Sequence, residues 1–539
     1  MVTTTRLPMQ SVSSSTCAAA FVCKSAPSLV AMRNKGLDMA LHCTAMAGSK
    51  GVVACLLSKM RTAVGGPDEA AALRAKNCLG ATALHGHRGL EQWCMKHLYH
   101  YHLAELPFHG RSGTSRRDTL PVVHRLSPCS PLGAARIQQL EKPSVADILH
   151  RDALRFRSLF RDHNHGSAAP APTSPGADGG GLSIPSRGDP IQELPGAFEY
   201  HVTAGFGTPV QQFTVGFDTT TTGATQLQCK PCAADEPCHH AFDPSASSSI
   251  AHVPCGSPDC PFNKGCSGHS CTLSVSINNT LLGNATFFTD KLTLTPWNIV
   301  DDFRFVCLEA GFRPDDDSTG ILDLSRNSHS LASRAAPSSP DAVAFSYCLP
   351  SYPSDVGFLS LGATKPELLG RKVSYTPLRS NRHNGNLYVV ELVGLGLGGV
   401  DLPVPRAAIA GGGTILELHT TFTYLKPKVY AALRDEFRKS MSQYPVAPPQ
   451  GSLDTCYNFT ALSSYSVPAV TLKFDGGAEF DLWIDEMMYF PEPGSYFSVG
   501  CLAFVAQDGG AVIGSMAQMS TEVVYDVRGG KVGFVPYRC

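Results

Sequence analysis

The chain has 539 residues, which is enough for two to four domains or for one large two-lobed body with extensions, and enough to bury a sizeable core. Its 44 Lys and Arg residues against 45 Asp and Glu residues give a net charge of -1, which argues against nucleic acid or an anionic membrane as the principal partner. No apolar run reaches about eighteen residues, so no membrane span is predicted.

Residues 1–118 are rich in Ala, Met, Cys and His and show no sustained periodicity, which predicts a weakly ordered N-terminal extension. Its His97, His100 and His102 could suggest a metal site, but no carboxylate or cysteine pattern surrounds them, and an exposed polar stretch is the preferred interpretation. No metal and no other cofactor is predicted. The apolar piece at residues 18–22 is too short for a signal-peptide core.

Residues 119–165 include a well-signalled helix at 143–160. Ser144 and Asp147 have the spacing of a capping box, and one face of the helix carries Val145, Leu149, Ala153, Phe156 and Phe160. The helix is basic because of Arg151, Arg155, Arg157 and Arg161. Two interpretations stay open: an ordinary amphipathic surface helix, or a propeptide helix whose cations neutralise an acidic cleft until it is removed.

Residues 166–193 are dominated by Pro, Gly, Ser and Ala and cannot bury enough apolar surface to order themselves, which predicts a linker open to cleavage. From residue 194 onward the pattern changes to short β-rich runs separated by Gly, Pro and Asn, which predicts an all-β body. Within it, a helix is expected at 427–440, which begins with Pro, and a hairpin at 523–535, whose turn contains two Gly residues.

Two stretches of this β body share one pattern, an apolar run followed by an acidic residue and then hydroxyl residues. The first places Asp218 before Thr219 and Thr220, and the second places Glu417 three residues before Thr420. This pattern indicates an internal duplication. Two strand-borne carboxylates brought together from two halves of a chain can form a dyad in which one acid keeps a proton while the other activates water.

Nineteen cysteines are many for a cytosolic protein, and twelve of them lie in the β-rich part. This even set predicts a disulfide framework and an oxidising compartment. The disulfide candidates are Cys229, Cys232, Cys238, Cys255, Cys260, Cys266, Cys271, Cys307, Cys348, Cys456, Cys501 and Cys539. A zinc site is the less favoured alternative for one group, namely Cys229, Cys232, Cys238, His239 and His240. Three sequons are glycosylation candidates, at Asn278, Asn284 and Asn458.

Several motifs appear in a fixed order: Gly-Thr-Pro at 207–209 before the first carboxylate, a seven-cysteine insert after it, FSYCLP at 345–350, LDTCYNF at 453–459 and CLAF at 501–504. Together they resemble the plant pepsin-like aspartic proteases of the nepenthesin type, from about residue 199 to 539. Residues 120–160 look like the propeptide of that family.

The resemblance implies a bilobal pepsin-like fold with a peptide cleft between an N-terminal β-lobe at 194–380, which carries the cysteine-rich insert, and a C-terminal β-lobe at 381–539. It implies Asp218 and position 417 as the catalytic carboxylates, secretion into an oxidising compartment, and a monomer acting on a peptide or protein.

The positions that depart from the family pattern are those that carry the catalytic chemistry. Each lobe of the family carries Asp-Thr-Gly or Asp-Ser-Gly, but Thr220 replaces the first glycine, and Glu417, Leu418 and His419 replace all three residues of the second motif. The flap tyrosine is replaced by Ile277. A displacement of about 1 Å at a reacting group can cost a hundredfold in rate.

Asp323, where the family has glycine, adds a third acid to the centre. Simpler roles for the acids also stay open: Asp218 could only cap a turn through Thr219 and Thr220, and Glu417 could pair with His419. Two functions are therefore weighed. The first is an acid endopeptidase with a degenerate Asp218/Glu417 dyad that leaves it weakly active or inactive. The second is a non-catalytic protein on the same fold that binds a peptide, a protein or a glycan, as do the inactive relatives that inhibit xylanases.

Overall fold

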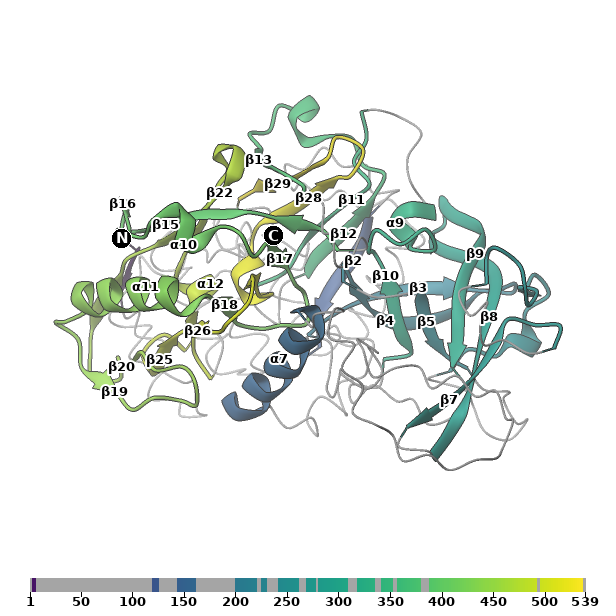
Figure 1. Ribbon diagram of the computed structural model, residues 1–539, viewed down its shortest axis with the longest axis horizontal. Helices are drawn as coiled ribbons and strands as arrows, with labels where there is room; N and C mark the ends of the chain where they lie inside the picture. The colour runs from purple at the N-terminus through teal and green to yellow at the C-terminus, as the bar shows by residue number, and fades with distance from the viewer. Residues whose placement is uncertain are drawn as a thin grey trace, which may run out of the picture.

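The computed structural model describes residues 2–5, 119–125, 143–160, 199–220, 224–229, 241–260, 268–277, 280–308, 318–334, 341–351, 356–379, 387–491 and 495–536. These residues form two β-lobes with few helices, as the sequence predicts (Figure 1). The N-terminal lobe is drawn in teal and the C-terminal lobe in green and yellow, and helix α7 (Val145–Phe160) lies between them. The predicted weakly ordered extension and the predicted linker lie outside the described residues, apart from β1.

One long sheet joins the two lobes. Its 14 strands run in the order β13 (Ser374–Pro377), β29 (Lys531–Val535), β28 (Glu522–Asp526), β11 (Phe345–Cys348), β12 (Val356–Leu361), β2 (Thr119–His124), β3 (Tyr200–Phe206), β4 (Gln211–Asp218), β10 (Gly320–Asp323), β5 (Thr225–Gln228), β9 (Asn298–Leu308), β8 (Thr280–Thr295) and β6 (Ala251–His252), with β7 (Thr272–Ile277) paired to β8. Strand β2 is an interior strand, because it pairs with β12 on one side and β3 on the other.

The C-terminal lobe contains three further sheets. Their strand orders are β14 (Val389–Val390), β17 (Thr414–Leu416), β27 (Ala511–Ile513), β18 (Thr423–Leu425), β26 (Phe504–Ala506); then β16 (Val400–Asp401), β15 (Leu392–Leu397), β22 (Val470–Phe474), β23 (Glu479–Leu482); then β19 (Val446–Ala447), β20 (Cys456–Asn458), β25 (Val499–Leu502), β24 (Met488–Tyr489). A two-stranded sheet pairs β1 (Val2–Thr5) with β21 (Ser464–Val467).

Among the described residues, the α-helices besides α7 are short, apart from α11. They are α9 (Leu331–Arg334), α10 (Arg406–Ile409), α11 (Pro427–Ser440) and α12 (Ile484–Met487). Helix α11 has the predicted bounds, and it buries Val429, Leu433 and Phe437 at the spacing that the sequence gives them. The predicted hairpin is formed by β28 and β29. In the described part of the chain, no helix is long and apolar enough to cross a membrane.

The internal duplication is present in the strand topology. In the first lobe, β10 runs parallel to β4 and antiparallel to β5, and β5 runs parallel to β9. In the second lobe, β27 runs parallel to β17 and antiparallel to β18, and β18 runs parallel to β26. The strands β4 and β17 that lead to the two carboxylates therefore occupy equivalent places in their lobes.

Disulfide bonds connect several of the predicted cysteines. The pairs are Cys229 with Cys307, Cys260 with Cys271, and Cys456 with Cys501, and Cys255 and Cys348 are also disulfide-bonded. Because Cys229 is oxidised, it is not available as a zinc ligand, and the alternative zinc site loses one member of its set. Cys232, Cys238, Cys266 and Cys539 lie outside the described residues.

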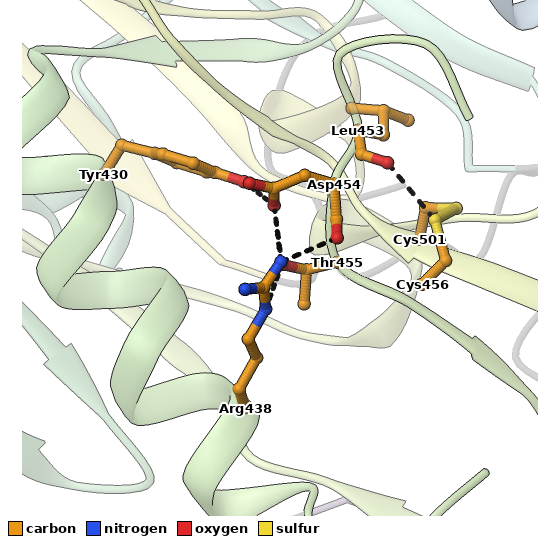
Figure 2. The surroundings of a disulfide bond; sticks show 7 residues. All are labelled: Tyr430, Arg438, Leu453, Asp454, Thr455, Cys456 and Cys501. Atoms are coloured by element: carbon orange, nitrogen blue, oxygen red, sulfur yellow. Dashed lines mark hydrogen bonds and ion pairs between the residues drawn. A yellow bond between two sulfur atoms is a disulfide. The ribbon is translucent and has the colours of Figure 1, made fainter. Parts of the chain in front are cut away.

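The Cys456–Cys501 bond fastens β20 to β25 beside helix α11 (Figure 2). Arg438 of this helix donates to the carbonyl oxygen of Asp454 at 2.7 Å and to Thr455 Oγ1 at 3.0 Å, and the hydroxyl of Tyr430 donates to the Asp454 carboxylate. The segment that precedes the disulfide is thus held against α11 by side-chain hydrogen bonds as well as by the covalent link.

Candidate active site

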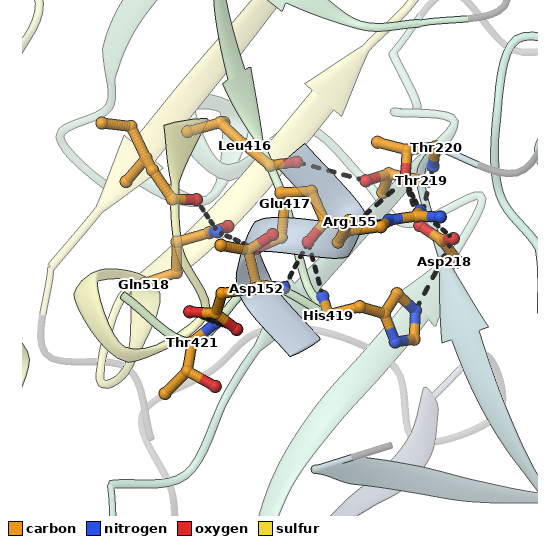
Figure 3. Close-up of polar contacts among 12 residues, drawn as sticks. Asp152, Arg155, Asp218, Thr219, Thr220, Leu416, Glu417, His419, Thr421 and Gln518 are labelled. Atoms are coloured by element: carbon orange, nitrogen blue, oxygen red, sulfur yellow. Dashed lines mark hydrogen bonds and ion pairs between the residues drawn. The ribbon is translucent and has the colours of Figure 1, made fainter. Parts of the chain in front are cut away.

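The two predicted carboxylates lie at one centre between the lobes. Asp218 is the last residue of β4, and Glu417 directly follows β17. The hydroxyl of Thr219 donates to the Leu416 carbonyl oxygen at 3.3 Å and links the two loops. The hydroxyl oxygen of Thr220 lies 2.7 Å from Asp218 Oδ1 and 3.2 Å from Glu417 Oε1. We call Asp218, Thr220 and Glu417 the carboxylate centre (Figure 3).

The second loop holds its acid in place although it lacks the family residues. Glu417 Oε2 accepts a hydrogen bond from the backbone amide of His419 at 2.9 Å and another from that of Thr420. The backbone φ angle of His419 is not positive, so this position does not require the conformational freedom of glycine. Its imidazole lies beside Asp218, with Nε2 3.6 Å from Oδ2 (Figure 3). The imidazole that replaces the family glycine is therefore accommodated against the first acid.

The backbone behind Glu417 is held by Gln518. Its side-chain amide donates to the Glu417 carbonyl oxygen at 3.0 Å and to the Ile513 carbonyl oxygen at 2.9 Å. Gly514 keeps this region closely packed, because a Cβ there would lie 2.3 Å from the Phe422 carbonyl oxygen. The backbone of the second loop is therefore fixed at the position that carries Glu417.

Arg155 of α7 occupies the space between the two acids (Figure 3). Its Nε donates to Glu417 Oε1 at 3.0 Å, and its Nη2 donates to Asp218 Oδ2 at 2.7 Å and also to the Thr220 hydroxyl. Asp218 and Glu417 are fully buried, and Arg155 is only 3% exposed. A buried charge of this kind is tolerated when it is paired and hydrogen-bonded on both sides, as it is here.

The electrostatics of the centre follow from this contact. Burial alone would raise the pKa of Asp218, but Arg155, His419 and the hydrogen bonds from Thr220 outweigh it, and the net pKa lies below its usual value. Burial would likewise lower the pKa of Arg155, but the two carboxylates raise it above its usual value. The ion pair is therefore maintained at neutral pH.

Two neighbours of Arg155 on α7 anchor the helix to both lobes. Arg151 donates to Glu199 Oε1 at 3.0 Å and to the Thr421 hydroxyl at 2.8 Å. The carboxylate of Asp152 accepts from the backbone amides of Thr421 at 3.0 Å and Phe422 at 2.9 Å. Arg151, Asp152 and Arg155, which lie within about one turn of α7, thus attach the helix to the interlobe region.

The start of α7 and its apolar side chains complete the attachment. The predicted capping box is confirmed, because Asp147 N donates to Ser144 Oγ at 3.2 Å and Ser144 N donates to Asp147 Oδ2 at 2.9 Å. Ile148 and Phe156 are buried, and the Phe156 ring lies 5.6 Å from that of Tyr424 between ring centres. The burial of Arg151, Asp152 and Arg155 therefore counts against the interpretation of α7 as an ordinary surface helix.

The comparisons with known proteins agree with this architecture. The families described as Xylanase inhibitor N-terminal and Xylanase inhibitor C-terminal match residues 200–363 and 387–536. An aspartyl protease family protein of Arabidopsis thaliana is 31% identical over 446 residues, which cover 79% of this chain and 88% of that protein. The chain belongs to the plant aspartyl protease family.

A second relative and a solved structure are also similar to this chain. Aspartic proteinase nepenthesin-2 of Nepenthes gracilis is 28% identical over 358 residues, which cover 63% of this chain and 78% of that protein. The crystal structure of edgp matches with a TM-score of 0.50 at 16% identity, covering 62% of this chain and 91% of that chain. The resemblance drawn from the motifs and the pepsin-like fold are confirmed.

Three other predicted site residues are Thr420, Ile277 and Asp323. The Thr420 hydroxyl is buried and makes no hydrogen bond among the described residues, so the link that Thr219 provides in the first loop has no counterpart there. Ile277 ends β7 and pairs with Thr280 across the turn of the predicted flap. Asp323 Oδ1 accepts from the Ser325 amide at 2.7 Å and closes the turn after β10.

The glycosylation candidates differ in accessibility. Asn458 is exposed, Asn284 is half-buried, and Asn278 lies outside the described residues. All three stay predictions.

The sequence reasoning missed several residues that form this site. Asp152 is an acid in the middle of a mainly basic helix, away from the cap that Asp147 forms, and this was a usable signal. Glu199 stands next to the first strand of the lobe and gives no pattern of its own. Burial alone would raise the pKa of Glu199, but Arg125 and Arg151 hold it well below its usual range. Gln518 gives no sequence signal, because its role depends on the fold around Glu417.

Asp152 predicts an unusual pH dependence of stability. Burial raises its pKa to about 7 against the opposing effects of Arg151 and the two amides. A folded-state pKa above the unfolded value means that the stabilising contribution is complete below about pH 4 and is lost as the pH rises through about 7. We therefore expect Asp152→Asn to become more stable relative to the unaltered chain between pH 4 and pH 8, measured by urea unfolding.

Asp147→Asn on the same helix is the matched control. Hydrogen bonds from Ser144 lower the pKa of Asp147, so its contribution is present above about pH 4 and is lost as the pH falls. Relative to the unaltered chain, Asp147→Asn should therefore stay level between about pH 4 and pH 8, where Asp152→Asn gains stability, and should recover only as the pH falls below about 4. Parallel curves for both would contradict the burial of Asp152 against the Thr421 amide.

Proposed function

We propose that this chain is a pepsin-like aspartic endopeptidase by descent whose Asp218/Glu417 centre, closed by Arg155, hydrolyses peptides weakly or not at all. The observation that carries the proposal is the guanidinium bound to both acids. A hydrolytic dyad needs one proton shared between the acids and a water between them, whereas a guanidinium favours two ionised carboxylates. The same contact supports a propeptide-like role for residues 119–165.

A non-catalytic function on the same fold is the second candidate. The matching families are described as xylanase inhibitor domains, and the second motif, Glu417-Leu418-His419, differs from that of the hydrolytic family members at every position. On this proposal the interlobe region or the surface binds a peptide, a protein or a glycoside hydrolase. In either case we propose a secretory or extracellular location and a monomer, and the disulfide bonds support an oxidising compartment.

A hydrolysis assay tests the proposal. The full chain and chain cut within residues 166–193 are incubated with a denatured globin-type substrate at about pH 3–5, with and without a pepstatin-type inhibitor. We expect no inhibitor-sensitive turnover from the full chain and little or none from the cut chain. Robust hydrolysis that the inhibitor stops, and that Asp218→Ala abolishes without unfolding the protein, would overturn the proposal.

A further inference from the structure

The carboxylate centre matches the shape of a guanidinium as well as its charge. The two acids come from different lobes and contact two different nitrogens of Arg155, at 3.0 Å from Nε and 2.7 Å from Nη2. A planar guanidinium offers several donors at fixed positions and can bridge acceptors that lie apart, whereas an ammonium is a compact point charge. The centre therefore discriminates between arginine and lysine by geometry.

In each acid of the centre, one carboxylate oxygen accepts hydrogen bonds from its own loop and the other contacts Arg155. Asp218 Oδ1 accepts from the amide and the hydroxyl of Thr220, and Glu417 Oε2 accepts from the amides of His419 and Thr420. The other oxygen of each acid, Oδ2 and Oε1, contacts the guanidinium. The acceptors are thus positioned by their own loops rather than by Arg155, which is the arrangement of a preorganised binding site.

The replacements that depart from the protease motif contribute directly to this site. Thr220, where the family has glycine, supplies a hydroxyl acceptor for Nη2. Glu417, where the family has aspartate, reaches the Nε edge with a longer side chain. The changes that remove a hydrolytic dyad are therefore the same ones that complete a guanidinium-binding pocket.

Recognition extends along one turn of the helix that carries the arginine. Arg151 forms an ion pair with Glu199, and Asp152 accepts hydrogen bonds from the backbone amides of Thr421 and Phe422. With Arg155 these residues form an Arg-Asp-x-x-Arg pattern. Arg155 lies four residues after Arg151 and three after Asp152, which are the spacings of neighbours on one side of a helix, so all three face the interlobe region. The interlobe region thus offers carboxylates to the two arginines and backbone amides to Asp152.

We propose that the carboxylate centre is an arginine-binding site, and that the interlobe region takes a helix bearing Arg-Asp-x-x-Arg from another polypeptide when α7 leaves it. The inference rests on the proposed function, because a centre that binds arginine in this way is not performing hydrolysis. The ligand class is a monoalkylguanidinium presented by a helical peptide.

The pocket itself is tested in the full-length Arg155→Ala variant with ethylguanidinium, which reproduces the end of the missing side chain. We expect ethylguanidinium to raise the thermal midpoint of this variant at about tenfold lower concentration than ethylammonium does, and to leave the unaltered chain unchanged. The double variant Arg155→Ala with Glu417→Gln should lose the response. Equal effects of the two cations, or no effect on the single variant, would overturn the inference.

Binding of the helix is tested with a labelled peptide of residues 143–160. The binding partner is the full-length triple variant Arg151→Ala, Asp152→Ala, Arg155→Ala, and its cooperative unfolding is verified first. We expect the peptide to bind this variant and to bind the unaltered chain much less, because the latter holds its own α7. A peptide with lysine for Arg155 should bind at least about tenfold more weakly, and one with citrulline more weakly still.

Equal affinities of the arginine and lysine peptides, or no binding to the folded variant, would overturn the proposed recognition in trans. Mass spectrometry of the recovered peptides keeps the two proposals separate. Cleaved peptide would contradict the proposed loss of hydrolysis, whereas the affinity ratio alone decides the arginine preference.

Discussion

Arg155→Ala is expected to lower the free energy of unfolding by about 3–5 kcal/mol at neutral pH, because it leaves two buried carboxylates without their cation. Denaturant unfolding followed by circular dichroism measures the change. The pKa of Asp218 lies below its usual value, so this contribution is present above about pH 4 and is lost as the pH falls further. The deficit of the variant should therefore shrink in acid.

Two controls define the origin of that loss. Arg434→Ala removes an arginine of α11 that pairs with Asp435 and Asp454 at the surface, and it should cost less than about 1 kcal/mol. Replacing Asp218 and Glu417 by Asn and Gln in the Arg155→Ala background should recover part of the loss, since no uncompensated charge remains. An Arg155→Ala variant as stable as the unaltered chain would show that the buried ion pairs of Arg155 with Asp218 and Glu417 do not form.

Restoring the second family motif is expected to have the largest effect on activity. The change is Glu417→Asp with Leu418→Ser and His419→Gly, in protein cut within the linker predicted at residues 166–193. The shorter acid and the small neighbours return the geometry of a dyad, and a shift of about 1 Å at the reacting groups is worth about a hundredfold in rate. We expect kcat/KM for an acid-denatured protein substrate at about pH 3–5 to rise by at least that factor.

Adding Asp218→Ala to the restored protein should abolish the gained activity, because the first acid is then missing. The matched control is Asp323→Asn in the same background, which changes the neighbouring acid that closes the turn at Ser325. A restored protein that folds but hydrolyses no faster than the unaltered chain would mean that features besides the second motif prevent catalysis.

Much of the fold could be predicted because local signals agreed with the final structure. The Ser144 and Asp147 cap, the proline that begins α11 and the shared strand pattern before Asp218 and Glu417 all act over a few residues. The duplication could be read as a pattern. The pairing of β2 with β3 and β12, however, joins Val123 to His201 and to Val356, which are far apart in the sequence, and local signals do not encode it.

The candidate site was predicted less completely, for a physical reason. Leu418 and His419 depart from the family motif, yet the Glu417 carboxylate is held by backbone amides, which any residue except proline provides. The basic character of α7 suggested a role at an acidic centre, but not which arginine fills it. That choice depends on the position of the helix between the lobes, which Glu199 and Asp152 fix together.

The strand order of the long sheet has a consequence for synthesis. Strand β11 pairs with β28, with Phe345 opposite Tyr525, although about one third of the chain separates them. As the ribosome releases the polypeptide from its N-terminal end, β11 keeps one row of amides and carbonyls open until β28 has emerged. A nonsense codon upstream of residue 522 would therefore yield a product with a permanently open, apolar strand edge, which is a template for self-association and a target for quality control.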